Sequence, residues 1–161
     1  GFNLFYGENV PDFDDEDKNL SQPQYQVTEE TPSFRNIFME NIQVAGAGKA
    51  AFFMGLPEMN LKNIHLKNSL LKADQGIEII DSDGMQFSNV KIISANNNDL
   101  QIYNGKNLQF NAISFDKKAE AKVKILGNKT HNISFSKKDF KASGKEIVLS
   151  KKVTASEITF E

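Results

Sequence analysis

Residues 12–17 (DFDDED) carry acidic side chains at alternate positions, which is how a calcium-binding loop begins. An EF-hand loop also needs a glycine at its sixth position and a glutamate at its twelfth, and this chain has Asp17 and Pro23 there. We therefore interpret the run as a solvated charge cluster, and we expect no metal site.

Residues 46–51 (GAGKAA) follow a strand-like segment and loosely match the G-x-G-x-x-A pattern of a dinucleotide-binding turn. That turn must open a helix, but Pro57 follows within a few residues. A phosphate-binding loop is excluded too, because Lys49 is followed by alanine where serine or threonine is required. We expect no bound nucleotide and no other cofactor.

The two histidines stand apart in the sequence, His65 in a strand-like segment and His131 in a polar turn. Neither has a cluster of acids beside it, so both are typical of surface residues rather than of metal ligands or catalytic bases. The chain has no cysteine, which excludes disulfides, zinc thiolates and thiol nucleophiles. It also lacks the interleaved aromatic and basic residues of a nucleic-acid-binding surface.

The elements that would position any site come from a repeat. A pair of apolar residues with one residue between them recurs along the chain, and the second residue of each pair is called here the anchor. Successive anchors are 27, 26, 23, 25 and 25 residues apart. Positions two before, three after and five after the anchor are also apolar, so that 20 of 22 aligned positions are apolar. The overall hydrophobic content of 39% would give about nine. Such a period marks a solenoid. The anchors are Phe34, Leu61, Phe87, Phe110, Phe135 and Phe160.

The spacing within the repeat predicts two short alternating strands joined by a bend. The bend falls on Asn36, Asn63 and Asn89, with Asn111 one residue early, and asparagine tolerates the left-handed backbone that a sharp bend requires. A third strand is expected in the rest of each repeat, over residues 51–54, 77–80, 100–103, 123–126 and 147–149.

Three strands in a repeat of roughly 25 residues predict an all-β protein, a right-handed parallel β-helix of about five coils. Successive coils would stack about 4.8 Å apart. An antiparallel sandwich is the alternative, because Asn104 and Gly105 between two apolar segments would suit a hairpin turn. A hairpin there does not account for the matching positions in the other repeats.

The chain of 161 residues is long enough for one domain with a core. We divide it into a strand of an incomplete first coil (residues 1–6), an acidic loop or arm (7–31) and the coils themselves (32–161), with an irregular C-terminal end. Residues 1–33 hold eight acids and one lysine, whereas the rest has a balance of +5. No apolar segment is long enough to span a bilayer.

The chain resembles the C-terminal part of bacterial polygalacturonases of glycoside hydrolase family 28. The resemblance rests on residues 28–37 (TEETPSFRNI) and 55–64 (GLPEMNLKNI), and it covers residues 1 to about 95. It implies a parallel β-helix that hydrolyses pectic polysaccharide with inversion, by one carboxylic acid and one carboxylate acting on either side of the bond. The family's Asn-Thr-Asp, Asp-Asp, Gly-His-Gly and Arg-x-Lys motifs are missing here, since Asp14-Asp15 belongs to the acidic run and Arg35 is followed by Asn36.

One functional position of that family has a counterpart in this chain. The family has a tyrosine at the end of a strand in its substrate groove, and the resemblance implies that Tyr6, which ends residues 3–6 (NLFY), contacts substrate. An aromatic residue that closes the first coil is the alternative interpretation of Tyr6.

We expect the chain to be the C-terminal β-helix portion of a polygalacturonase-type hydrolase, which is inactive alone and belongs to a longer periplasmic or secreted parent. Its partner would be pectic oligosaccharide or polysaccharide, with no nucleic acid and no membrane. The alternative is a non-catalytic carbohydrate-binding or structural β-helix module. A polysaccharide lyase would need a calcium cluster or a basic catalytic residue that the sequence does not offer. Because a solenoid end exposes a strand edge, the first coil should be covered by residues 7–31 or by a second copy of the chain.

Overall fold

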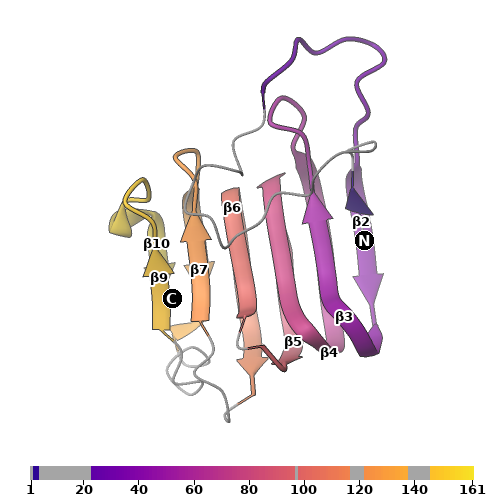
Figure 1. The fold of residues 1–161 in the computed structure, drawn as a ribbon, viewed down its shortest axis with the longest axis vertical. Coiled ribbons are helices and arrows are strands. Elements are labelled where there is room, and N and C mark those ends of the chain that lie inside the picture. The colour runs from indigo at the N-terminus through magenta and orange to yellow at the C-terminus, as the bar shows by residue number, and fades with distance from the viewer. Residues whose placement is uncertain (1, 4–22, 97, 117–121, 138–145) are drawn as a thin grey trace.

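A computed structural model describes residues 2–3, 23–96, 98–116, 122–137 and 146–161. They form a right-handed parallel β-helix of about five coils, as the repeat predicts. In Figure 1 the coils stack side by side, from β2 at the right to β9 and β10 at the left. The strands are β1 (Phe2–Asn3), β2 (Arg35–Glu40), β3 (Gln43–Met54), β4 (Leu61–Asp83), β5 (Gln86–Ser94), β6 (Asn98–Phe115), β7 (Lys122–Leu126), β8 (His131–Phe135), β9 (Glu146–Leu149) and β10 (Ile158–Phe160).

Every strand pair of the described residues is parallel, so the antiparallel sandwich is wrong. The expected third strands are confirmed, because Ala51, Ile77, Leu100, Val123 and Ile147 lie in one register across five coils. Asn104 does not open a hairpin. It turns a corner inside β6, which continues in the same coil.

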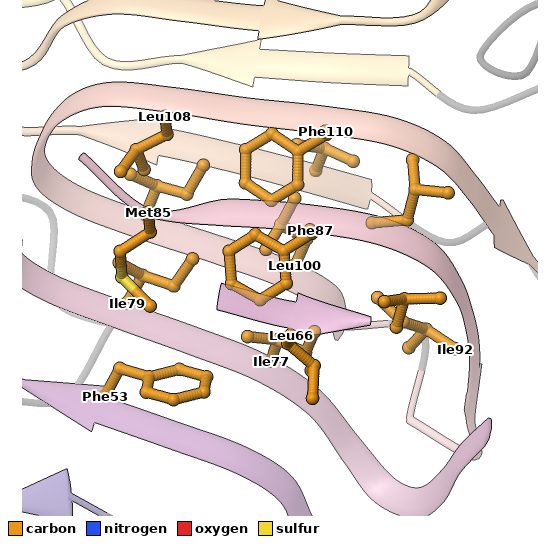
Figure 2. Packing of buried hydrophobic residues seen from close by; sticks show 14 of the residues in the cluster. Phe53, Leu66, Ile77, Ile79, Met85, Phe87, Ile92, Leu100, Leu108 and Phe110 are labelled. Carbon is orange, nitrogen blue, oxygen red and sulfur yellow. The ribbon is translucent and has the colours of Figure 1, made fainter. Parts of the chain in front are cut away.

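The core is a set of apolar columns that run from coil to coil. The rings of Phe87, Phe110 and Phe135 stack face to face, with centroids 4.9 and 4.8 Å apart and planes tilted by 12° and 11°. Figure 2 shows Phe87 and Phe110 beside a second column, in which Met85 and Leu108 are neighbours. All five side chains are at most 1% exposed, so each stacked ring is covered by the next coil. Face-to-face contact arises here because the parallel register repeats the same position at every rung.

The corners of the coils are made by residues with a left-handed backbone, most of them asparagines. Asn36, Asn63 and Asn89 have φ values of 57°, 51° and 54°, which confirms the predicted bends. At the fourth bend the residue with positive φ is Ala112 (52°) rather than Asn111. In the left-handed region the Cβ of most residues comes too close to the backbone. Asparagine is favoured there because its short polar side chain tolerates this conformation.

The register differs from the sequence alignment at one step. Arg35 pairs with Lys62, which matches Phe34 with Leu61 as expected, but Phe87 pairs with Leu66 and not with Leu61. The alignment is therefore wrong by five residues between the second and third coils. The true column consists of Met39, Leu66, Phe87, Phe110, Phe135 and Phe160.

The N-terminal predictions are tested only in part. Phe2 and Asn3 pair in parallel with Phe53 and Met54 of β3, whereas Tyr6 and the acidic run at 12–17 lie outside the described residues. Residues 23–33 form no strand and are almost wholly exposed. Gln24 reaches the far coils, where the Lys129 ammonium donates a hydrogen bond to its Oε1 at 3.4 Å.

Candidate functional site

The outer face of one sheet carries the features most suited to binding. This sheet, called here the first sheet, consists of β2, the start of β4, the start of β5, the end of β6, β8 and β10. Side chains alternate along each strand, so the neighbours of the core residues point outward. One row of outward residues, the outer row, crosses all six strands in register: Phe38, His65, Gln86, Gln109, Ser134 and Thr159.

Phe38 is the unusual member of the outer row. It is 68% exposed, although it lies between Ile37 and Met39, which face the core. Its ring packs on the imidazole of His65, with centroids 4.7 Å apart and planes tilted by 32°. The two rings form one wall of a hollow of about 260 Å³, whose other polar side chains come from Glu40, Lys67, Gln86 and Ser88.

The hydrogen bonds around His65 fix its orientation. The Asn63 amide nitrogen donates to Asn36 Oδ1 at 2.7 Å, so the Asn63 oxygen is left to face His65 Nε2, also at 2.7 Å. Because that oxygen can only accept, Nε2 must carry the hydrogen. The other ring nitrogen, Nδ1, then remains available to a ligand. The interpretation of His65 as a surface residue is confirmed, since it lies half-buried in the outer row.

Positive charge borders the outer row. Arg35 and Lys62 are neighbours on adjacent strands, just before the first corner of each coil. Lys106 and His131 hold the equivalent position two and three coils beyond Lys62. Asp83 is the exception in this line, in register with Lys106. On the other side of the outer row Lys67 lies 3.7 Å from Glu40, an exposed ion pair of small energetic value. A mainly basic border favours acidic ligands.

A second hollow of about 300 Å³ lies around the next corner, and amide side chains line it. Asn89 donates to Asn68 Oδ1 at 2.8 Å, and Asn68 donates to Glu40 Oε1 at 2.9 Å. The two hollows therefore share a hydrogen-bonded chain through Glu40. Lys91 and the exposed Leu70 complete the wall of the second hollow.

The strongest electrostatic perturbation lies in a third corner, away from both hollows. Asp81 is 1% exposed and has a positive φ of 44°. Burial raises the pKa of Asp81 from 3.8 to about 6, against the opposing effects of a hydrogen bond from Asn104 and the charges of Lys129 and Lys106; Glu58 adds to the rise. The Asn104 amide donates to Asp81 Oδ1 at 3.0 Å, and Oδ2 has no partner within the described part of the chain. This carboxyl group is too deeply enclosed to touch a polymer, so we assign it a structural role.

Residues 46–51 and His131 both lie in strands. The segment at 46–51 lies within β3 and opens no helix, which excludes the dinucleotide turn. His131 is exposed as the first residue of β8, one position beyond the turn in which it was expected. Sequence reasoning missed Phe38, although the signal is present: it is an apolar residue at an outward position of the alternation.

In the described ranges, no group of three or more His, Cys, Asp or Glu side chains is close enough to hold a metal ion. The same ranges contain no helix long and apolar enough to cross a membrane.

The fold and the outer face together define a parallel β-helix with a polar, partly aromatic surface across its rungs. Comparison with known proteins adds no narrower class. No family model matches the chain, and neither a curated protein nor a solved structure resembles it closely enough to be counted as a match.

Proposed function

We propose that this β-helix binds an acidic polysaccharide along the outer row of its first sheet. The observation that carries the proposal is the exposed Phe38 ring, packed on His65 at the edge of a hollow lined by polar side chains. The apolar face of a sugar ring can lie on such an aromatic surface, and the amides and hydroxyls beside it supply hydrogen bonds to sugar hydroxyls.

The rungs give this surface its reach. Parallel strands repeat every 4.7–4.9 Å or so, so Gln86, Gln109 and Ser134 offer one polar group per rung along the axis. A polymer running along the axis would meet a similar group at each step. The basic border formed by Arg35 and Lys62 favours a polymer with carboxylate groups.

Pectic polymer is the first ligand to test, because the sequence resembles polygalacturonases. In such a protein the described coils would supply scaffold and one wall of the groove. Hydrolysis with inversion needs two carboxyl groups across the bond. Among the described residues that line the hollow, Glu40 is the single carboxylate. We therefore expect no release of reducing ends when the chain alone is incubated with polygalacturonate, and clear turnover would contradict this role.

Binding is tested by affinity electrophoresis in gels that contain polygalacturonate, with a neutral polysaccharide as the reference. We expect retardation by the acidic polymer and at least a tenfold weaker interaction for Phe38→Ala. The matched control is Val148→Ala, which removes an exposed apolar side chain (39%) from β9, away from the outer row. Equal mobility of the Phe38→Ala variant and the unchanged protein would exclude this binding site.

A further inference from the structure

The hollow beside Phe38 is bordered by two rows of outward side chains, and the second row carries its charges. Glu40, Lys67 and Ser88 lie in register on β2, β4 and β5, two residues further along these strands than the outer row. Two residues of a strand span about 6.6 Å, which is enough for the body of one sugar ring between the rows. A sugar ring that lies on Phe38 therefore reaches the charged row with its substituents.

Glu40 is held in place by Asn68 rather than by Lys67. The Asn68 amide donates a hydrogen bond to Glu40 Oε1 at 2.9 Å, and the Asn89 amide donates to Asn68 Oδ1 at 2.8 Å. The Lys67 ammonium lies 3.7 Å from the same Glu40 oxygen, which is beyond hydrogen-bond distance. Glu40 is thus fixed by a chain of amides that crosses three coils, whereas Lys67 adds only a loose ion pair.

Lys67 is free to exchange its partner. The side chains of Lys67 and Glu40 are 59% and 52% exposed, so water screens the pair and its contribution to stability is small. The flexible lysine stem allows the ammonium to turn from Glu40 toward a ligand, and Glu40 keeps its hydrogen bond from Asn68 when this happens. Lys67 is the single lysine or arginine among the described residues that line this hollow.

The other polar groups of the hollow suit hydroxyl groups. His65 Nε2 donates its hydrogen to Asn63, so His65 Nδ1 can accept, and Gln86 and Ser88 offer an amide and a hydroxyl. These groups can bind the hydroxyls of neutral and acidic sugars alike. Within the hollow, the distinction between a carboxylate and its uncharged methyl ester therefore depends on Lys67.

We propose, on the basis of the polysaccharide-binding function proposed above, that Lys67 binds the free carboxylate of a uronate unit and that Glu40 competes for the same ammonium. An unesterified uronate displaces Glu40 and forms a charge-assisted hydrogen bond with Lys67. A methyl-esterified unit carries no charge, so it leaves the pair with Glu40 in place and gains only the contacts to Phe38 and the hydroxyl-binding groups. The hollow thus selects unesterified over esterified polymer.

Affinity electrophoresis in polygalacturonate and in the same polymer after methyl esterification tests this role. We expect the unchanged protein to bind the unesterified polymer more tightly, and Lys67→Gln to weaken that binding about tenfold, the effect of one hydrogen bond to a charged group. Lys67→Gln should leave binding to the esterified polymer unchanged. Glu40→Gln removes the competitor and keeps an acceptor for Asn68, so binding to the unesterified polymer should tighten about two- to fivefold. Weaker binding by Glu40→Gln overturns the competition.

The matched control is Lys72→Gln. Lys72 is an exposed lysine of the same strand, β4, and it lies outside the residues that line either hollow, so its substitution removes the same charge without touching the site. We expect this variant to keep the preference for the unesterified polymer. An equal loss of preference in Lys72→Gln and Lys67→Gln overturns the proposal, because net charge alone would then account for it.

Failure of the binding function and failure of the role of Lys67 give different results. If the unchanged protein binds neither polymer, the proposed function is wrong and the role of Lys67 is wrong with it. If the unchanged protein binds both polymers and Phe38→Ala weakens both, but Lys67→Gln weakens neither, the binding function stands and the role of Lys67 alone is wrong.

Discussion

The middle coils and the first coil use similar side chains, but they bury them to very different degrees. Ile42 is 38% exposed, whereas Val90 and Ile113, which hold the equivalent inward position, are each 1% exposed. Met39 is half-buried, whereas Phe110 in the same column is fully buried. Within the described residues, what differs is that a middle coil has a neighbouring coil on both sides.

The comparison shows that burial in this fold is a property of the stack. Each coil contacts only the coils beside it, so stability accumulates through nearest-neighbour interfaces. A side chain in the first coil therefore contributes less than its chemical equivalent in the middle.

Phe110→Ala should lower the free energy of unfolding by about 3–5 kcal/mol, because it leaves a cavity between two stacked rings in a fully buried column. The same substitution at Phe34, which is 38% exposed in the first coil, should cost about 1 kcal/mol or less. Urea denaturation followed by far-UV circular dichroism measures both. Similar losses at the two positions would show that the first coil is covered as well as the middle ones.

Asp81→Asn should remove a pH dependence of stability that belongs to the middle coils. Because burial raises the pKa of Asp81 from 3.8 to about 6, the folded protein holds this proton more tightly than the unfolded chain does. The contribution to stability is complete below pH 4 or so and is lost as the pH rises through about 6, at most about 3 kcal/mol in all.

The substitution keeps the acceptor for Asn104 and suits the positive φ, so the variant should match the natural protein near pH 4 and exceed it in stability near pH 8. Asp74→Asn, at an exposed carboxyl group in β4, is the control and should leave the pH dependence unchanged. Urea midpoints at several pH values measure the effect. The prediction is contradicted if the unchanged protein gains stability between pH 4 and pH 8 and Asp81→Asn abolishes that gain.

Much of the coil architecture could be predicted because alternation and period determine it. The third strands were placed correctly, since Ile77, Leu100 and Val123 are inward residues of short alternating segments between turns. The step from Leu61 to Phe87 could not be predicted in the same way. Both Leu61 and Leu66 are fully or almost fully buried, at 0% and 4% exposure, so the apolar pattern fits either residue beside Phe87.

The backbone resolves this ambiguity through its corners. Asn63 and Asn68 both have positive φ and bound one short strand, and the next coil has Gly84 and Asn89 in the same roles. Asparagine 89 was correctly predicted as a bend, but it belongs with Asn68 and not with Asn63. The outer face was harder still, because nothing in a single sequence distinguishes a polar residue that binds a ligand from one that only meets water. Phe38 is the exception that alternation could have identified.

Gly55→Ala should be destabilising where the same change at Gly48 is not. A Cβ at Gly55 would lie 2.2 Å from the Asp81 carbonyl oxygen and 2.6 Å from the Leu61 backbone nitrogen, so the backbone itself must shift. We expect a loss of about 1–3 kcal/mol or more. At Gly48, in β3 of the first coil, a Cβ meets nothing within 4 Å, and the gain from a less flexible unfolded chain should be about 0.4–1 kcal/mol. Thermal unfolding measures both, and equal effects would mean that the first coil is as tightly enclosed as the third corner.

Ala112→Asn should stabilise the protein by about 1 kcal/mol, since alanine pays for the left-handed backbone that asparagine tolerates. Ala112 continues the corner of Asn68 and Asn89, in which the Asn89 amide donates to the Asn68 amide of the coil before it. Asparagine there would extend this ladder by one hydrogen bond, while Ala112→Gly relieves the backbone alone. The difference between the two variants in urea midpoint therefore isolates the amide ladder. If Ala112→Gly is as stable as Ala112→Asn, the corners are held by backbone conformation and the exposed amides add nothing measurable.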